Sequence, residues 1–390
     1  MKPSARSDIP PFYVMEVMKA AADRERTHGD VLHLEVGQPS TPAPQTVLAR
    51  AAAVLADDRL GYTHALGVDE LRGRIARLYL ERHGLEIPRR RVAITAGASG
   101  GFVLALLAAF DAGARIGITE PGYAAYRNII SALGLELVGI RVGKENRYVP
   151  TPDDLARVGP LDGLVTASPS NPTGTMFTDE EQAAIVDACR SRGVRLIADE
   201  IYHGITYGRA APTVLEHTDD AVVVQSFSKY QSMTGWRLGW LILPDELVRP
   251  FERLAQNLFI CPSAIAQHAA IAAFDGTADL DANVARYAAS RVALIEGLGR
   301  MGLGDMAPVE GAFYVWVDVS SLEIDSQELC ARWLAEIGVA ATPGVDFDPV
   351  AGDRFVRFSY SEATVHIVEA VERLEGWMAA RADRLAGRDG

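Results

Sequence analysis

Cysteine, positive charge and long apolar runs are all scarce in this sequence. Its three cysteines, Cys189, Cys261 and Cys330, form no C-x-x-C pair, so neither a disulfide framework nor a zinc ribbon is indicated. A reducing compartment is the simpler interpretation. No apolar run approaches the roughly 18 residues of a membrane span, and the N-terminal segment lacks the apolar stretch of a signal peptide. We therefore expect a soluble, cytoplasmic protein with no membrane partner and no metal.

Acidic residues outnumber basic residues, and this balance limits the classes of ligand that the protein can bind. The 38 lysines and arginines against 51 aspartates and glutamates give a net charge of −13. Such a balance argues against a nucleic-acid partner. Any anionic ligand must therefore meet a local group of positive charges.

What is abundant is an alternation of strand and helix patterns. The segments 194–198, 221–227 and 238–243 are near-continuous apolar runs, as expected of strands covered on both faces. Helix patterns lie between the predicted strands, including 102–110 after the glycine-rich segment 97–101. The pattern predicts an α/β fold with a large doubly wound domain around a mostly parallel sheet.

The length of 390 residues favours more than one domain. Residues 1–44 are punctuated by proline and predict an arm that joins part of a small domain, with a helix from Tyr13 and a strand at 31–36. Residues 45–280 carry the strand and helix alternation. Residues 281–390 begin with a long predicted helix, 281–301, and read as a smaller α+β domain.

Residues with chemical potential follow several of the predicted strands. Ligands bind beyond the carboxyl ends of the strands in open α/β sheets. The residues in such positions are the glycine-rich turn, Asn171, Asp199 with Tyr202, and Lys229 with Arg237. Lys229 lies between two apolar strand patterns, where the cost of desolvating a cation lowers a lysine pKa and favours Schiff-base chemistry.

Three segments together resemble the class I and II aminotransferases, which are pyridoxal-phosphate enzymes of fold type I. They are Ser-Asn-Pro-Thr-Gly at 170–174, Asp-Glu-Ile-Tyr at 199–202, and Ser-x-Ser-Lys at 226–229 followed by Thr-Gly-Trp-Arg-Leu-Gly at 234–239. Their order and spacing match from Gly37 to Arg357, so the resemblance covers nearly the whole chain.

The resemblance implies an aminotransferase that moves an amino group from an L-amino acid to a 2-oxo acid. Lys229 would hold pyridoxal 5′-phosphate as a Schiff base and shuttle the proton. Asp199 would pair with the pyridine nitrogen, and Tyr202 and Asn171 would hydrogen-bond the phenolic oxygen of the ring. Arg357 would clamp the substrate carboxylate, helped by Asn171 and by the backbone of Gly37.

The resemblance also implies the rest of the cofactor site and a homodimer with a shared active site. Tyr123 would stack on the pyridine ring, and Tyr62 would reach the phosphate of the neighbouring subunit. The phosphate would meet backbone N–H groups, hydroxyls and a guanidinium from Ala98, Ser99, Ser226, Ser228 and Arg237.

Two other functions compete with transamination. The same fold supports lyases and synthases that act on amino acids. The residues 97–101 are also a literal G-x-S-x-G, so Ser99 is a candidate hydrolase nucleophile. That hydrolase leaves Lys229, Asn171 and both arginines without a role. The cluster at 11–13 and Gln38 favour a neutral or aromatic amino donor over an acidic one.

Overall fold

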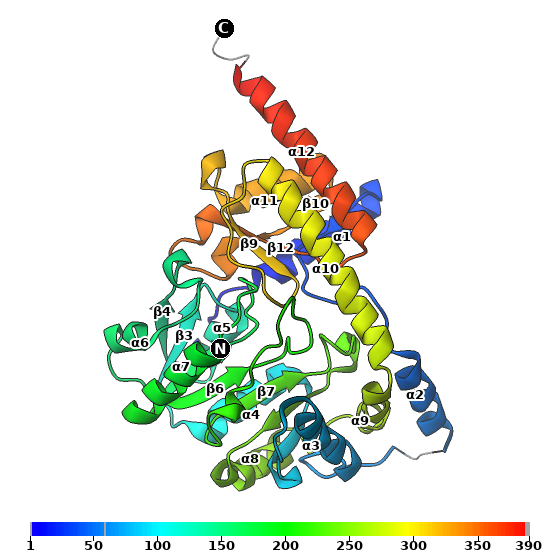
Figure 1. Cartoon of the computed structure of the whole chain (residues 1–390), viewed down its shortest axis with the longest axis vertical. Helices are drawn as coiled ribbons and strands as arrows, with labels where there is room; N and C mark the ends of the chain where they lie inside the picture. Colours follow the sequence, from blue (N-terminus) through cyan, green and yellow to red (C-terminus); the bar gives the residue numbers. More distant parts are fainter. Residues whose placement is uncertain (1, 58–59, 387–390) are drawn as a thin grey trace.

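The computed structural model describes residues 2–57 and 60–386, and a seven-stranded sheet forms the centre of its larger part (Figure 1). The strand order is β2-β8-β7-β6-β5-β3-β4. Only β8 is antiparallel to its neighbours, β2 and β7. The predicted mostly parallel α/β sheet is therefore confirmed. The strands are β2 Val92–Thr95, β3 Arg115–Glu120, β4 Glu136–Arg141, β5 Gly163–Ala167, β6 Arg195–Asp199, β7 Val222–Ser226 and β8 Gly239–Ile242.

Helices cover both faces of this sheet because its strands are apolar on both sides. In β7, Val222 and Val224 belong to one buried cluster, with residues of α4, α5 and α8, whereas Val223 belongs to another, with residues of α2, α3, α7 and α9. Successive side chains of a strand point to opposite faces. These helices are α2 Gln45–Asp57, α3 Asp69–His83, α4 Gly97–Ala109, α5 Ala124–Ala132, α7 Asp179–Arg192, α8 Asp245–Leu258 and α9 Ala264–Ile271; the short α6 is Pro152–Arg157.

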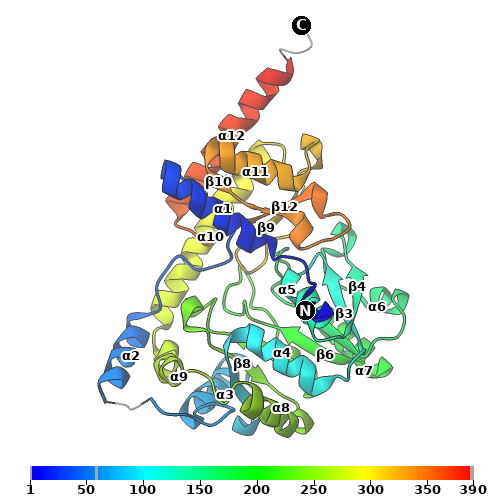
Figure 2. The ribbon, with the colours of Figure 1, turned by 180° about the vertical axis from the view of Figure 1, so that it is seen from behind.

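A second group of elements lies at one end of the large sheet and joins the two ends of the chain. It holds a three-stranded antiparallel sheet, β11-β12-β9, and a parallel pair, β1 with β10. In Figure 2, α1 lies across this group beside α11, and α12 extends away toward the C-terminus. The elements are α1 Tyr13–His28, β1 Leu32–His33, α10 Thr277–Arg300, β9 Tyr314–Asp318, α11 Ser326–Ile337, β10 Val339–Ala340, β11 Thr342–Pro343, β12 Phe355–Ser359 and α12 Thr364–Ala386.

Three predicted boundaries are wrong, two of them for tertiary reasons. The strand expected at 31–36 is only Leu32–His33, because beyond it the Glu35 carbonyl accepts hydrogen bonds from the side chains of Thr342 and Arg357 instead of a neighbouring strand. The helix expected at 102–110 begins at Gly97. Its glycines serve close packing: a Cβ on Gly101 would lie 2.6 Å from Leu241 of β8. The helix expected at 281–301 begins four residues earlier.

Across the described ranges, no helix combines the length and the apolar character that crossing a membrane requires.

Candidate active site

A cavity opens where the carboxyl ends of the parallel strands meet the second group of elements. β2, β3, β5, β6 and β7 run in the same direction, so their carboxyl ends share one edge of the sheet. Nearly every predicted site residue lines this cavity: Gly37, Ala98, Ser99, Tyr123, Asn171, Asp199, Tyr202, Ser226, Ser228, Lys229, Arg237 and Arg357. Tyr62 does not line it and is 84% exposed.

Lys229 lies on the segment that follows β7, with its amine inside the cavity. Its Nζ donates a hydrogen bond to the carbonyl of Gly37 at 2.6 Å. Burial, with the charges of Arg357 and Arg237, lowers the Lys229 pKa to about 8, whereas Asp199 opposes the shift. About a tenth of this amine is therefore uncharged at neutral pH, far more than for an exposed lysine, and the uncharged amine is the form that reacts with a carbonyl.

Asp199 ends β6, and both of its carboxylate oxygens already have donors. Tyr126 donates from its hydroxyl to Oδ2, and the backbone N–H of Ile201 donates to Oδ1 at 3.0 Å. Burial raises the Asp199 pKa to about 6, and the hydrogen bonds from Tyr126 and Ile201 together with the charge of Lys229 limit that rise. Sequence reasoning missed Tyr126; its spacing of three from Tyr123, in a predicted helix, was the available signal.

Tyr202 follows β6, and its hydroxyl lies 2.7 Å from the hydroxyl of Tyr314 in β9. Tyr314 was also missed. Its hydroxyl occupies the space beside Gly37, where a Cβ would come within 1.7 Å of the oxygen. Glycine at position 37 therefore leaves room for the Tyr314 hydroxyl beside the residue whose carbonyl accepts from Lys229. The predicted hydrogen bond from Tyr202 to a ring oxygen stays a prediction.

Arg357 lies in β12 and is only 2% exposed. It donates to Asn171 Oδ1 at 3.0 Å, to the carbonyl of Glu35, and to Thr342 Oγ1 at 3.2 Å. The guanidinium also lies over the ring of Tyr314, at 4.5 Å from its centre. Among the described residues, the hydrogen-bond partners of Arg357 include no carboxylate, so its guanidinium, which lines the cavity, can pair with the carboxylate of a ligand.

The part of the cavity lined by the start of α4 has donors of the kind that bind a phosphate group. Ala98 and Ser99 lie in the first turn of α4, where backbone N–H groups are free and the helix dipole favours an anion. Arg237 lies against this turn: a Cβ on Gly97, whose φ is +70°, would come within 2.8 Å of Arg237 Nη2. Ser226 and Ser228 add hydroxyls to the lining. Together with Lys229 and Asp199, this donor set fits a phosphorylated pyridine aldehyde.

The remaining wall of the cavity is apolar and comes from the arm. Its residues are Phe12, Val14, Met15, Met18 and Val36, with Ile129 from α5. Asp346 holds the start of α1 in place because its carboxylate accepts from the backbone N–H groups of Tyr13 at 3.1 Å and Val14 at 3.3 Å. The sequence pointed to this arm, but Tyr13 and Gln38 are not among the lining residues.

The hydrolase alternative lacks the histidine of a serine triad. Ser99 lines the cavity, but none of the lining residues that the structure describes is a histidine. A serine nucleophile needs a base within hydrogen-bond reach. Ser99 lies in the first turn of α4, a position that favours an anion.

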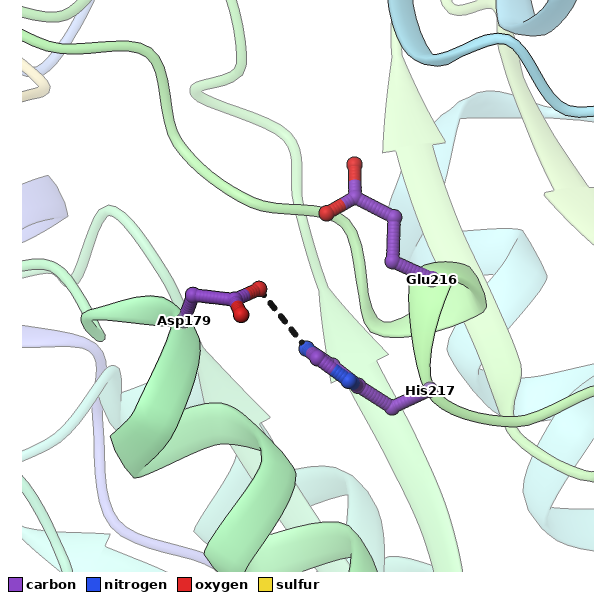
Figure 3. Close-up of side chains that lie close together, drawn as sticks. All are labelled: Asp179, Glu216 and His217. Atoms are coloured by element: carbon purple, nitrogen blue, oxygen red, sulfur yellow. Dashed lines mark ion pairs between the residues drawn. The ribbon is translucent and has the colours of Figure 1, made fainter.

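Away from the cavity, Asp179, Glu216 and His217 bring three metal-type ligand atoms within 4.8 Å of one another (Figure 3). Ion pairs account for this group. His217 Nε2 lies 3.0 Å from Asp179 Oδ1, and His83 Nδ1 lies 3.0 Å from Glu216 Oε1. The two carboxylates are exposed at the surface.

Comparison with known proteins identifies the same family over almost the full length. A family model described as aminotransferase class I and II matches residues 29–374. The chain is 50% identical to a valine–pyruvate aminotransferase of Mycobacterium tuberculosis, over 96% of this chain and 98% of that protein. It is 31% identical to an aspartate/prephenate aminotransferase of Thermus thermophilus, over 96% and 95% of the two chains.

Solved structures agree with these sequence relatives. A crystal structure of an aminotransferase from Mycobacterium tuberculosis superposes with a TM-score of 0.96 at 49% identity, covering 97% of this chain and 100% of that one. An aspartate aminotransferase from Thermus thermophilus with maleate superposes with a TM-score of 0.91 at 27% identity, covering 96% and 99%.

Proposed function

This chain belongs to the class I and II aminotransferase family, and we propose that it transfers the amino group of an apolar L-amino acid to pyruvate with pyridoxal 5′-phosphate as cofactor. The protein is an aminotransferase; the cofactor, the residue roles and the substrates are the proposed part. The observation that carries the proposal is the buried amine of Lys229, which shares one cavity with the carboxylate of Asp199 and the guanidinium of Arg357.

Pyridoxal phosphate supplies an aldehyde that condenses with amines and a ring that withdraws electrons from the substrate. Asp199, kept ionised, would hold a proton on the ring nitrogen. Asn171 and Tyr202 would hydrogen-bond the phenolic oxygen, and Tyr123 would pack on the ring. The phosphate is held by the first turn of α4, at Ala98 and Ser99, and by the side chains of Ser226, Ser228 and Arg237.

Arg357 binds the substrate carboxylate with two parallel N–H donors, and Asn171 and the backbone of Gly37 complete that end of the site. The amino acid is thereby oriented so that its Cα–H bond faces Lys229. Lys229 Nζ would act as the base that takes the Cα proton of the bound amino acid. The hydrogen bond from Nζ to the Gly37 carbonyl supports this role, because Gly37 belongs to the end of the site proposed to bind the carboxylate.

The cofactor and its lysine are tested together. The protein mixed with pyridoxal phosphate is expected to turn yellow, and borohydride should bleach the colour and leave a phosphopyridoxyl group on Lys229, identified by peptide mass spectrometry. A protein that stays colourless with excess pyridoxal phosphate, or a label on another lysine, would contradict the proposal. Lys144, an exposed surface lysine paired with Asp305 at 2.6 Å, is the internal control for nonspecific labelling.

An apolar donor is supported by the lining of the cavity and by the named relative. The wall formed by Phe12, Val14, Met15, Met18 and Val36 offers no charge to a side chain. The cations of the lining, within the described residues, are Lys229, Arg237 and Arg357, and each already has a proposed role. A side-chain carboxylate therefore finds no spare cation in this subunit.

A donor panel measures this directly. With pyruvate as acceptor, we expect a higher kcat/KM for valine than for aspartate. With valine as donor, pyruvate should be preferred over 2-oxoglutarate, whose second carboxylate has no partner. A preference for aspartate or 2-oxoglutarate would contradict the substrate assignment while leaving the cofactor assignment intact.

A homodimer with a shared active site is also proposed, with Tyr62 reaching the phosphate of the partner subunit. Tyr62 is 84% exposed, and the adjoining segment exposes Leu258, Phe259 and Ile260. The two segments lie together, since the Thr63 N–H donates to Cys261 Sγ at 3.4 Å. Sedimentation should give a dimer. Tyr62→Phe should weaken pyridoxal phosphate binding while the protein remains a dimer. An active monomer would contradict this.

A further inference from the structure

Tyr126 is a lining residue of the cavity to which the proposed function assigns no role. It lies in α5, is 6% exposed, and its hydroxyl donates to Asp199 Oδ2. Tyr230, which is equally buried, donates to the carboxylate of Asp281 at 2.6 Å, whereas the half-buried Tyr207 donates to the carbonyl of Ala312 at 2.8 Å. Tyr126 instead meets the carboxylate whose ionisation matters most to the proposed chemistry.

The surroundings of Asp199 explain why the hydrogen bond from Tyr126 affects its ionisation. The carboxylate is fully buried, and burial opposes its ionisation. Three groups act against that penalty: the Tyr126 hydroxyl from α5, the backbone N–H of Ile201 after β6, and the charge of Lys229 after β7. Burial and the nearby charge of Asp199 raise the Tyr126 pKa well above its ordinary value, so Tyr126 stays a neutral phenol that donates.

The ring of Tyr126 has a separate packing role. Its centre lies 5.3 Å from that of Tyr123, nearly perpendicular at 85°, and 5.0 Å from that of Phe102. The hydroxyl and the ring therefore act on different partners. A change to phenylalanine keeps both ring contacts and removes only the donor to Asp199.

We propose that Tyr126 is a positioning residue of the cofactor site, whose hydroxyl keeps the Asp199 carboxylate ionised and directed at the ring nitrogen of pyridoxal phosphate. The inference rests on the proposed function. Tyr126 acts through Asp199, so its effect should follow the protonation of that carboxylate. Without the hydroxyl, a larger fraction of Asp199 is protonated. A protonated carboxyl cannot hold a positively charged ring nitrogen.

The test measures the Kd of pyridoxal phosphate for the apoprotein by fluorescence titration, in wild type and in Tyr126→Phe, at about pH 6 and about pH 8.5. Both proteins carry Lys229 and meet the same cofactor, so the ratio of their Kd values at each pH reports the effect of removing the Tyr126 hydroxyl. Because the Asp199 pKa should rise in the variant, we expect the ratio to be about tenfold at the lower pH and about twofold at the higher one. The matched control, Tyr207→Phe, should give a ratio near one at both.

A ratio below twofold at both pH values, or the same ratio at both, would overturn the proposal, since a merely structural effect does not follow the ionisation of Asp199. A second measurement uses Asp199→Asn, which removes the charge that Tyr126 serves. In that background Tyr126→Phe should change the Kd less than twofold, and an undiminished loss would also overturn the proposal. Failure of wild type to bind pyridoxal phosphate would instead overturn the proposed function.

Discussion

Two regions of the cavity, here called the floor and the wall, differ in the chemistry and in the origin of their side chains. The floor, Asn171, Asp199, Ser226, Lys229 and Arg237, consists of polar side chains that end or follow strands of the large sheet. The wall, Phe12, Val14, Met15, Met18 and Val36, consists of apolar side chains from an arm that is far away in sequence. The floor carries groups that suit almost any amino acid, whereas the wall meets the one part of the substrate that differs between amino acids.

The two regions also differ in how they are held. In the floor, Asn171, Asp199 and Ser226 are buried. Hydrogen-bond partners fix the Asp199 carboxylate between Tyr126 and Ile201. The wall depends on the start of α1, which is tied to Asp346, and Met15 within it is 54% exposed. Changes in the floor should therefore abolish chemistry or cofactor binding, and changes in the wall should alter the choice of substrate.

The largest expected effect is at the centre of the floor. Lys229→Ala should lower kcat by at least about a thousandfold, because it removes both the amine that holds the cofactor and the group that moves the Cα proton. Single-turnover absorbance with valine measures the loss. The control Lys144→Ala removes a lysine that is exposed at the surface and should leave kcat unchanged. Residual activity within tenfold of wild type would contradict the role proposed for Lys229.

The two arginines at opposite ends of the cavity should separate substrate binding from cofactor binding. Arg357→Ala should raise the KM for valine about a hundredfold, since charge-assisted hydrogen bonds are worth about 1.5–3 kcal/mol. The colour of the bound cofactor should remain.

Arg237→Ala should do the reverse, weakening pyridoxal phosphate binding while the KM for valine at saturating cofactor changes little. An unchanged KM in Arg357→Ala would show that the substrate carboxylate is bound elsewhere.

The pH dependence of cofactor capture tests the electrostatics of the floor. Because the Lys229 pKa is lowered to about 8, the charged amine dominates below that pH and the free amine above it. The rate of colour formation with the apoprotein should rise about tenfold per pH unit below pH 8 and level off above it. Arg357 lowers this pKa, so Arg357→Gln should move the midpoint to higher pH. A rate independent of pH, or a midpoint that moves down, would contradict this account.

The smallest expected effect lies in the wall. Phe12→Ala removes apolar contact area beside Tyr123, whose ring centre is 5.7 Å away. A loss of about 1 kcal/mol should raise the KM for valine about fivefold and affect alanine less, with kcat nearly unchanged. Phe12→Leu should restore most of the affinity. Equal losses for valine and alanine would show that the arm shapes the whole site and not only the side-chain pocket.

The sequence alone determined the fold class, the family and the composition of the floor. Short motifs at strand ends were enough, because parallel strands bring their carboxyl ends to one edge whatever the loops between them do. Lys229, Asp199 and Asn171 could thus be expected in one cavity from their local patterns, and the structure brings them together there.

Only the tertiary structure decided which residues surround that floor. Tyr126 meets Asp199 across 73 positions, Tyr202 meets Tyr314 across 112, and Arg357 meets Asn171 across 186. No local pattern encodes such pairs. The glycines of α4 and the shortened strand at Leu32 show the same cause, since packing against distant segments overrode the local preference for a turn and for a longer strand. Contacts between distant segments depend on the packing of the whole chain, and so does the apolar wall.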